Sequence, residues 1–192
     1  MMPMEKYLYL SEHSHVDAWV YGGEVPFFKT SKYKDQERKG IFTPDENLID
    51  TSTFDFRPYS NAIFLGDNII NCNVSLTVDG VEIVRDAKVN KWTEDGLVVC
   101  FANRRSRFIA KKLEKKACVR VLNVELLKTL IDAHVGSKGE MDFCKYTKSH
   151  NRNHFLKSDE DSWQDEFRMF WKDVEPIKLI LPPGIAVLEF YR

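Results

Sequence analysis

Polar and aromatic residues alternate in the segment 161–171, which reads DSWQDEFRMFW. Taken as a strand, its period of two places Gln164, Glu166 and Arg168 on one face, together with Phe170. The opposite face, which we expect to anchor the core, carries Trp163, Asp165, Phe167, Met169 and Trp171. An amide, a carboxylate and a guanidinium in a row could act together on one ligand. The alternative is a solvated strand face on which Glu166 pairs with a lysine of a neighbouring strand.

A second group of polar residues lies just upstream, in CKYTKSHNRNHFLKS. It contains Tyr146, His150, Arg152, His154 and Lys157. Cations bind phosphates and aromatic rings stack on bases, so this composition suits a nucleotide or another small anionic ligand. A solvated basic loop would have the same composition. The two histidines do not form an H-E-x-x-H motif, and we expect no metal.

A third candidate lies near the start of the chain, where His13 stands between an expected strand and an expected helix in LSEHSHVDAWVYGG. Backbone N–H groups at a helix start attract anions, so His13 could border a ligand site. Ser14 acting only as a helix cap explains the same residues.

The segment 103–116, NRRSRFIAKKLEKK, predicts a helix capped by Asn103. Its cations could bind a nucleic-acid backbone: Arg104, Arg105, Arg107, Lys111, Lys112, Lys115 and Lys116. The alternative is an ordinary surface helix with a buried stripe of Phe108, Ile109 and Leu113. We expect nucleic acid to be an improbable partner, because the net charge of the chain is only −1.

The composition is that of a globular protein, with 192 residues, 43% hydrophobic and 12% aromatic. The four cysteines form no C-x-x-C pair, which argues against zinc and against a disulfide framework. No P-loop, G-x-G-x-x-G or G-x-S-x-G motif is present, which argues against the enzyme classes that carry them. We expect a cytoplasmic protein without a signal peptide or a membrane span.

The elements predict one α+β domain over residues 1–192, with a mainly antiparallel mixed sheet and a few short helices. Asp79-Gly80 predicts a β-hairpin, and Asn123 and Gly136 should bound a helix. A second hairpin is expected around residues 93–96, TEDG. Strands are also predicted at 141–147 and 163–171, and a pair of strands around Pro182-Pro183-Gly184. Thr43, Pro44 and Glu46 form the pattern of a helix capping box.

Several short motifs resemble a widespread family of uncharacterised bacterial proteins known only as a domain of unknown function. They are Val99-Cys100-Phe101, Cys118-Val119-Arg120-Val121, Tyr146-Thr147, Lys157 and the block from Trp163 to Arg168. The resemblance covers about residues 97 to 190. It implies no established activity.

Gln164-x-Glu166 at the start of a late strand is similar to the Q/E-x-E element of ADP-ribosyltransferases. That resemblance implies a compact NAD-binding fold in which Glu166 stabilises an oxocarbenium-like transition state and Gln164 orients the acceptor. NAD would be the substrate. The pocket would then be lined by Tyr146, His154, Lys157, Arg168 and His13.

Three functional hypotheses follow. The first is an ADP-ribosyltransferase-like protein of bacterial or phage origin that binds NAD or another nucleotide, in which Gln164, Glu166 and the segment 7–15 must meet in one concave site. The second is a protein-interaction module from a phage, mobile element or defence locus, with Trp19, Trp92 or Trp171 in an exposed patch. The third is a nucleic-acid binder using the helix at 104–116. On the site-wall interpretation, Glu166→Gln should leave folding nearly intact, whereas Phe167→Ala should cost about 3–5 kcal/mol.

Overall fold

The computed structural model describes residues 3–34, 45–61, 63–66 and 68–192. Within these ranges the chain forms thirteen β-strands, three α-helices and three short 3₁₀ helices. All strand pairs are antiparallel except one. The prediction of an α+β fold with mainly antiparallel sheets is therefore confirmed. Thr43 and Pro44 of the expected capping box lie outside the described residues.

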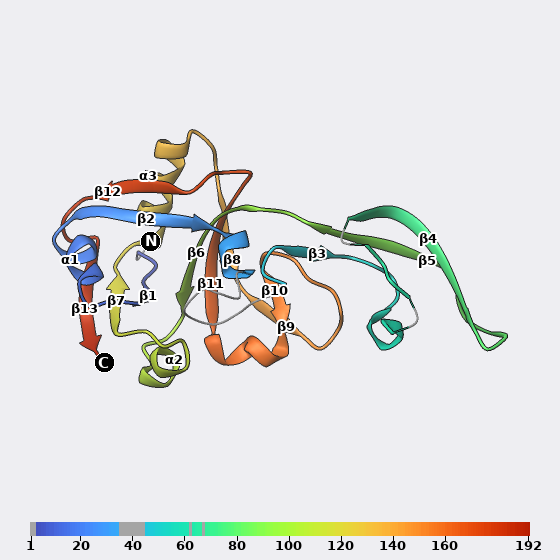
Figure 1. Ribbon diagram of the computed structural model, residues 1–192. Coiled ribbons are helices and arrows are strands. Elements are labelled where there is room, and N and C mark those ends of the chain that lie inside the picture. Colours follow the sequence, from blue (N-terminus) through green and yellow to red (C-terminus); the bar gives the residue numbers. More distant parts are fainter. Residues whose placement is uncertain (1–2, 35–44, 62, 67) are drawn as a thin grey trace.

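The main sheet has eight strands and divides at β6. Its members are β1 (Lys6–Leu10), β2 (Gly23–Lys29), β6 (Gly96–Ala102), β7 (Ala117–Val121), β8 (Glu140–Phe143), β11 (Glu166–Lys172), β12 (Ile177–Leu181) and β13 (Ala186–Tyr191). One path runs in the order β12-β2-β6-β1-β7-β13, and β11 and then β8 branch from β6. β6 therefore has three neighbouring strands, β1, β2 and β11, and the sheet divides there (Figure 1).

A second sheet projects from the main sheet as a long ribbon (Figure 1). It consists of β3 (Leu48–Asp50), β4 (Ile69–Val78) and β5 (Val81–Thr93), in the order β3-β5-β4. Asp79 and Gly80 both have positive φ and form the turn between β4 and β5, which confirms the hairpin predicted there. A separate small apolar cluster around Phe56, Ala87 and Val89 stabilises the base of this ribbon.

The helices are short, and local signals explain the longest of them. They are α1 (His15–Val20), α2 (Arg107–Lys112), α3 (Val124–Val135), η1 (Thr30–Lys34), η2 (Arg57–Tyr59) and η3 (Asp159–Gln164). The side chain of Asn123 accepts a hydrogen bond from the N–H of Leu126, and Gly136 ends α3 in the left-handed conformation, as predicted. Leu127 and Ile131 of α3 are fully buried in the main core.

The helix predicted over 103–116 is shorter and starts later. Ser106, not Asn103, caps α2, because its hydroxyl accepts from the N–H of Ile109 at 3.2 Å. Asn103 instead donates its side-chain N–H to the backbone oxygen and to the carboxylate of Asp165, both at 3.0 Å. A tertiary contact therefore takes the residue that the sequence assigns to the cap.

The hairpin expected around TEDG is wrong. β5 pairs with β3 and β4, whereas β6 pairs with β1, β2 and β11. Between them, the carboxylate of Asp95 accepts hydrogen bonds from the hydroxyl of Thr30 at 2.6 Å and the N–H of Ser31 at 3.0 Å. This attachment to η1 directs the chain from one sheet into the other.

The strands around Pro182-Pro183-Gly184 exist, but they are neither paired nor neighbours in the sheet. β12 pairs with β2, whereas β13 pairs with β7. They stand at opposite ends of the six-strand path. The strand predicted over 141–147 is also divided, into β8 and a short strand β9 (Lys145–Thr147) that pairs in parallel with β10 (Leu156–Ser158).

Gly96 packs so closely against β11 that we expect Gly96→Ala to lower the free energy of unfolding by about 1–3 kcal/mol or more. A Cβ at residue 96 would lie 2.2 Å from the backbone oxygen of Trp171, so the two strands would have to separate. Urea unfolding measures the effect. Gly66→Ala is the matched control, since a Cβ there has nothing within 4 Å. Equal stability of the two variants would contradict this packing.

Candidate functional site

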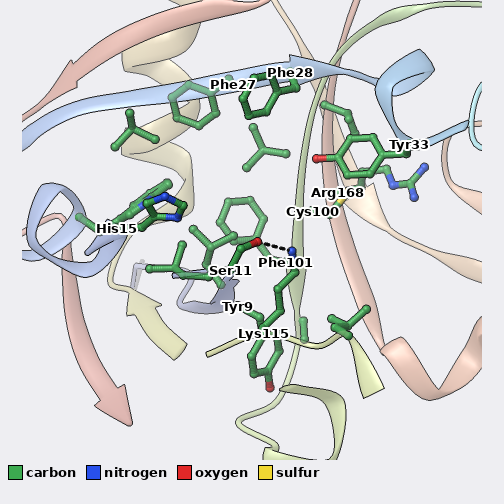
Figure 2. Close-up of a pocket in the computed structure, with 18 of the residues that line it drawn as sticks. Tyr9, Ser11, His15, Phe27, Phe28, Tyr33, Cys100, Phe101, Lys115 and Arg168 are labelled. Carbon is green, nitrogen blue, oxygen red and sulfur yellow. Dashed lines mark hydrogen bonds between the residues drawn. The ribbon is translucent and has the colours of Figure 1, made fainter. Parts of the chain in front are cut away.

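A cavity of about 390 Å³ lies where the main sheet divides (Figure 2). β11 pairs with β6 along its whole length on one edge. On the other edge, β2 pairs only with Leu97 and Val98, and β1 pairs only with Ala102. Residues 99–101 are paired with neither strand on that edge, and the cavity occupies the space between β1, α1, β2 and β6.

Most side chains that line the cavity are apolar. They come from β1, α1, β2, β6 and the α2 region, and include Leu8, Trp19, Phe27, Val99, Phe101 and Ile109. Figure 2 shows Phe27 and Phe28 at the top of the space and Tyr9 at its bottom, with Phe101 between them. The walls are formed by regular strands and helices, so the cavity is part of the folded framework.

A buried ionic cluster closes one end of the cavity. Its members are Glu46, Lys157, Glu166 and Arg168, all of which line the cavity and all of which are buried. Arg168 Nε donates to Glu166 Oε1 at 2.7 Å, and Lys157 Nζ donates to Glu166 Oε2 at 2.9 Å. Arg168 Nη2 lies 2.5 Å from Glu46 Oε1. Two carboxylates therefore face two cations.

The charges of the cluster compensate one another. Burial disfavours the ionised form of Glu166, but Arg168 and Lys157 outweigh it and hold the pKa of this carboxyl well below its ordinary value. The pKa of Lys157 is raised, because Glu166 and Glu46 outweigh its own burial. Burial, followed by the charge of Glu166, raises the pKa of the nearby Cys100 thiol well above its ordinary value. Cys100 is thus a thiol, and not a reactive thiolate.

Gln164 extends the cluster toward η3. Its Oε1 accepts from Lys157 Nζ at 3.1 Å, and its Nε2 donates to Asp161 Oδ1 at 2.9 Å. Burial raises the pKa of Asp161. Gln164 lines the cavity beside Glu166, so the structure brings the two residues predicted as catalytic together.

The opposite part of the wall forms a polar rim of Ser11, Ser14, His15 and Lys115. The first three are exposed and Lys115 is half-buried. Lys115 Nζ donates to the hydroxyl of Ser11 at 2.8 Å, as Figure 2 shows. The cavity therefore has mainly apolar walls and an ionic cluster at one end, and its exposed polar lining residues include the carboxylate of Glu24 as well as these side chains.

The strand that carries Glu166 and Arg168 differs from the prediction. β11 begins at Glu166, because Trp163 and Gln164 belong to η3 and Asp165 has a positive φ that breaks the extended backbone. Both faces of β11 are buried from Glu166 to Trp171, because Phe167, Met169 and Trp171 pack in the main core on one face. On the other face, Glu166 and Arg168 pair with Lys157 and Glu46. The solvated face considered for this segment is thus wrong.

The other predicted ligand-binding residues lie elsewhere. Tyr146 does not line the cavity. Its phenol oxygen accepts a hydrogen bond from the backbone N–H of Glu166 at 2.9 Å. His154 stacks on Phe170 at 3.5 Å and its Nε2 lies 3.2 Å from a carboxylate oxygen of Glu94, outside the cavity. His13 packs edge-on against Tyr191 and does not line the cavity, whereas His15 does.

The upstream basic loop is also bound to the protein itself. Arg152 Nε donates to Asp45 at 2.9 Å, and His150 Nε2 lies 2.9 Å from the backbone oxygen of Ser52. The two residues therefore connect the loop to β3 and its surroundings. Of the five polar residues noted in this segment, Lys157 alone lines the cavity.

Most cations around α2 contact groups of the protein. Arg104, Arg105 and Lys116 form ion pairs with Asp165, Glu189 and Glu12. Arg107 lies over the ring of Phe190 and Lys112 over the ring of Trp163. The side chains of Arg104, Arg105 and Lys116 are nonetheless 58%, 50% and 48% exposed, so the nucleic-acid hypothesis stays a prediction.

The tryptophans named for an exposed patch are not exposed. Trp19 and Trp171 are buried in the main core, and Trp92 is half-buried on β5. The large exposed apolar residues are others, with Phe64, Ile180 and Tyr21 the most exposed among the described residues.

Sequence patterns gave no signal for several cavity residues. Glu46 fitted the pattern of a capping box, but its carboxylate pairs with Arg168. No chemical motif marked Cys100, which lies beside Glu166. Lys115 stood among seven cations with nothing to distinguish it. Only their position relative to β6 in the folded chain identifies them.

No group of three or more His, Cys, Asp or Glu side chains in the described ranges could hold a metal ion. None of the described helices has the length and apolar character needed to cross a membrane.

Comparison of the chain with protein-family models, with curated proteins and with solved structures found no match. The two family resemblances therefore stay predictions.

Proposed function

We propose that this protein binds a small, mainly apolar molecule in the cavity at β6. The observation that carries the proposal is a cavity of about 390 Å³ with predominantly apolar walls. Protein interiors are close-packed, and voids larger than a water molecule are few. Binding pockets for small molecules typically have volumes of about 300–1,000 Å³ and walls of hydrophobic and aromatic side chains with a few polar groups.

The balance of charge favours an apolar ligand body. Lys157 and Arg168 are both engaged by Glu166, and Arg168 also by Glu46. A ligand charge placed against this cluster would lack a compensating partner and would carry a large desolvation cost. The inner end of the cavity is therefore suited to uncharged groups.

A fluorescence titration with N-phenyl-1-naphthylamine, a neutral probe that brightens in apolar surroundings, tests the proposal. We expect a saturable rise in emission with one site per chain and a concentration-dependent rise in melting temperature, because the probe binds only the folded state. A linear, unsaturable signal without a change in melting temperature would contradict it.

Transfer chemistry on NAD is the second candidate. It is supported by the meeting of Gln164 and Glu166 with residues 8–10 of β1, Ser11 and His15 of α1 around one cavity, as the ADP-ribosyltransferase resemblance requires. Both oxygens of the Glu166 carboxylate accept hydrogen bonds from cations. A ribose hydroxyl would reach this carboxylate only after Lys157 or Arg168 moves.

Nicotinamide release from NAD separates the two candidates. The transferase predicts release by the wild type and its loss in Gln164→Ala, with binding of N-phenyl-1-naphthylamine unchanged or competed by NAD. The apolar-ligand proposal predicts no release and no competition by NAD. Release that is equal in the wild type and Gln164→Ala would exclude Gln164 from the transfer step.

A further inference from the structure

We infer that the ribbon binds a second copy of this chain, through antiparallel pairing of β4 with β4 of that copy. The inference goes beyond the cavity and does not depend on its ligand. It rests on three features of the ribbon, which are an unpaired strand edge, the absence of charge on that edge and an outer part built from two strands.

The unpaired edge belongs to β4. In the order β3-β5-β4 it is the terminal strand, and its hydrogen bonds to other described segments are formed with β5. Asn71, with a φ of 53°, bends the start of β4, whereas residues 72–78 have no positive φ. The ribbon projects away from the main sheet, so another chain can approach this edge (Figure 1). The free N–H and C=O groups of such an edge are a template for pairing with another strand.

β4 lacks the features that normally protect an edge strand. Proteins prevent edge pairing with short edge strands, charged side chains and proline. Ile69–Val78 has 10 residues, none of them charged and none of them proline. The strands at the ends of the main sheet have 4, 5 and 6 residues, and each carries charge: Glu140 and Asp142 on β8, Lys178 on β12, and Glu189 on β13. The contrast indicates that the β4 edge is free to pair.

The outer part of the ribbon consists of two strands. β3 pairs with Lys91–Thr93 of β5, and the N–H groups of Thr51 and Thr53 extend this contact as far as Lys88. From Lys88 to the turn, β4 is the partner of β5 among the described strands. A two-stranded hairpin alone is only marginally stable in water. Two ribbons joined through β4 would place four strands side by side in this part.

The side-chain pattern of β4 suits pairing with itself. Val74, Leu76 and Val78 share one face of the strand, where Leu76 is buried and the two valines are half-buried. A two-fold axis perpendicular to the sheet makes β4 antiparallel to its copy and puts the apolar residues of both copies on the same face. Because β4 carries no charge, no register of this pairing opposes like charges. A second copy therefore fits this edge without any complementary charge.

Sedimentation velocity over about a hundredfold range of protein concentration tests the inference, because a dimer dissociates on dilution. We expect the wild type to sediment as a dimer at the highest concentration. Asn73→Lys combined with Thr77→Lys should weaken dimerisation at least about tenfold, because it places like charges along the shared edge. Both residues are exposed, so the fold should be retained.

The matched control is Thr129→Lys combined with Ser137→Lys. It adds the same charge at exposed positions of α3 and the loop after it, away from the ribbon, and should dimerise like the wild type. A wild type that is monomeric at every concentration, or a dimer that the two lysines on β4 leave unchanged, would overturn the inference.

Amide hydrogen exchange of the wild type locates the interface and needs no variant. Exchange at residues 72–78 should slow as the protein concentration rises, because free N–H groups of the edge become hydrogen-bonded in the dimer. Exchange in β8, another edge strand, should not change with concentration. Slowing in β8 without slowing at 72–78 would overturn the inference, even where the lysine variant does not fold.

Discussion

Replacing Glu166 by Gln is expected to lower the free energy of unfolding by about 3–5 kcal/mol, because it leaves buried charge uncompensated. Glu166 accepts from Arg168 at 2.7 Å and from Lys157 at 2.9 Å, and all three side chains are buried. Without the Glu166 carboxylate, Arg168 would keep its pair with Glu46, but Lys157 would have only the more distant carboxylates of Asp161 at 3.9 Å and Glu46 at 4.0 Å. This expectation replaces the one drawn from the sequence, in which the substitution leaves folding nearly intact.

Urea unfolding of the wild type and Glu166→Gln measures the loss. The matched control is Glu82→Gln, which breaks the ion pair with Arg85 on the exposed β5 ribbon, where both side chains are in solvent. Exposed pairs contribute about 0–1 kcal/mol, so the control should be close to the wild type. If the two variants lose equally little stability, the buried cluster contributes no more to folding than an exposed ion pair.

Replacing Ala18 by Trp is expected to weaken binding of N-phenyl-1-naphthylamine at least about tenfold, a loss of about 1.4 kcal/mol or more in binding free energy. Ala18 lies on α1, is half-buried and lines the cavity. An indole at this position would occupy space that is already present. We therefore expect the probe to be excluded while the melting temperature stays at or above that of the wild type.

Ala133→Trp provides the comparison for Ala18→Trp. Ala133 is exposed on α3 and does not line the cavity, so the same substitution adds the same indole elsewhere. Binding in this variant should equal that of the wild type. Wild-type affinity in Ala18→Trp would place the probe outside the cavity, and equal loss in both variants would indicate an effect unrelated to the site.

Local signals predicted the elements that local interactions form. The Asp79-Gly80 turn and the ends of α3 at Asn123 and Gly136 depend on residues close in sequence, and all were found as expected. The path from β5 to β6 was not predictable in this way. It depends on Asp95 contacting Thr30 and on Gly96 packing against Trp171, residues that lie far apart in the sequence.

The candidate site was predictable in its parts but not in its environment. Glu166 and Arg168 could be placed on one face of a strand, and Gln164 and Lys157 close by. The period of a strand does not tell whether a face is solvated. Glu166 is buried because Lys157 and Arg168 contact its carboxylate, and because Glu46 comes from a distant segment to pair with Arg168. The cavity itself arises from the branching of the sheet, which no short motif encodes.

Methyl-group NMR spectra of the protein with and without N-phenyl-1-naphthylamine test the central claim most directly. The aromatic rings of the probe should shift the methyl resonances of Leu8, Val25, Val99 and Ile109, which line the cavity. The methyl resonances of Val74, Val84 and Val89 in the separate cluster of the ribbon should not move. Shifts confined to the ribbon, or no shifts at a saturating probe concentration, would contradict the assignment of the cavity as the binding site.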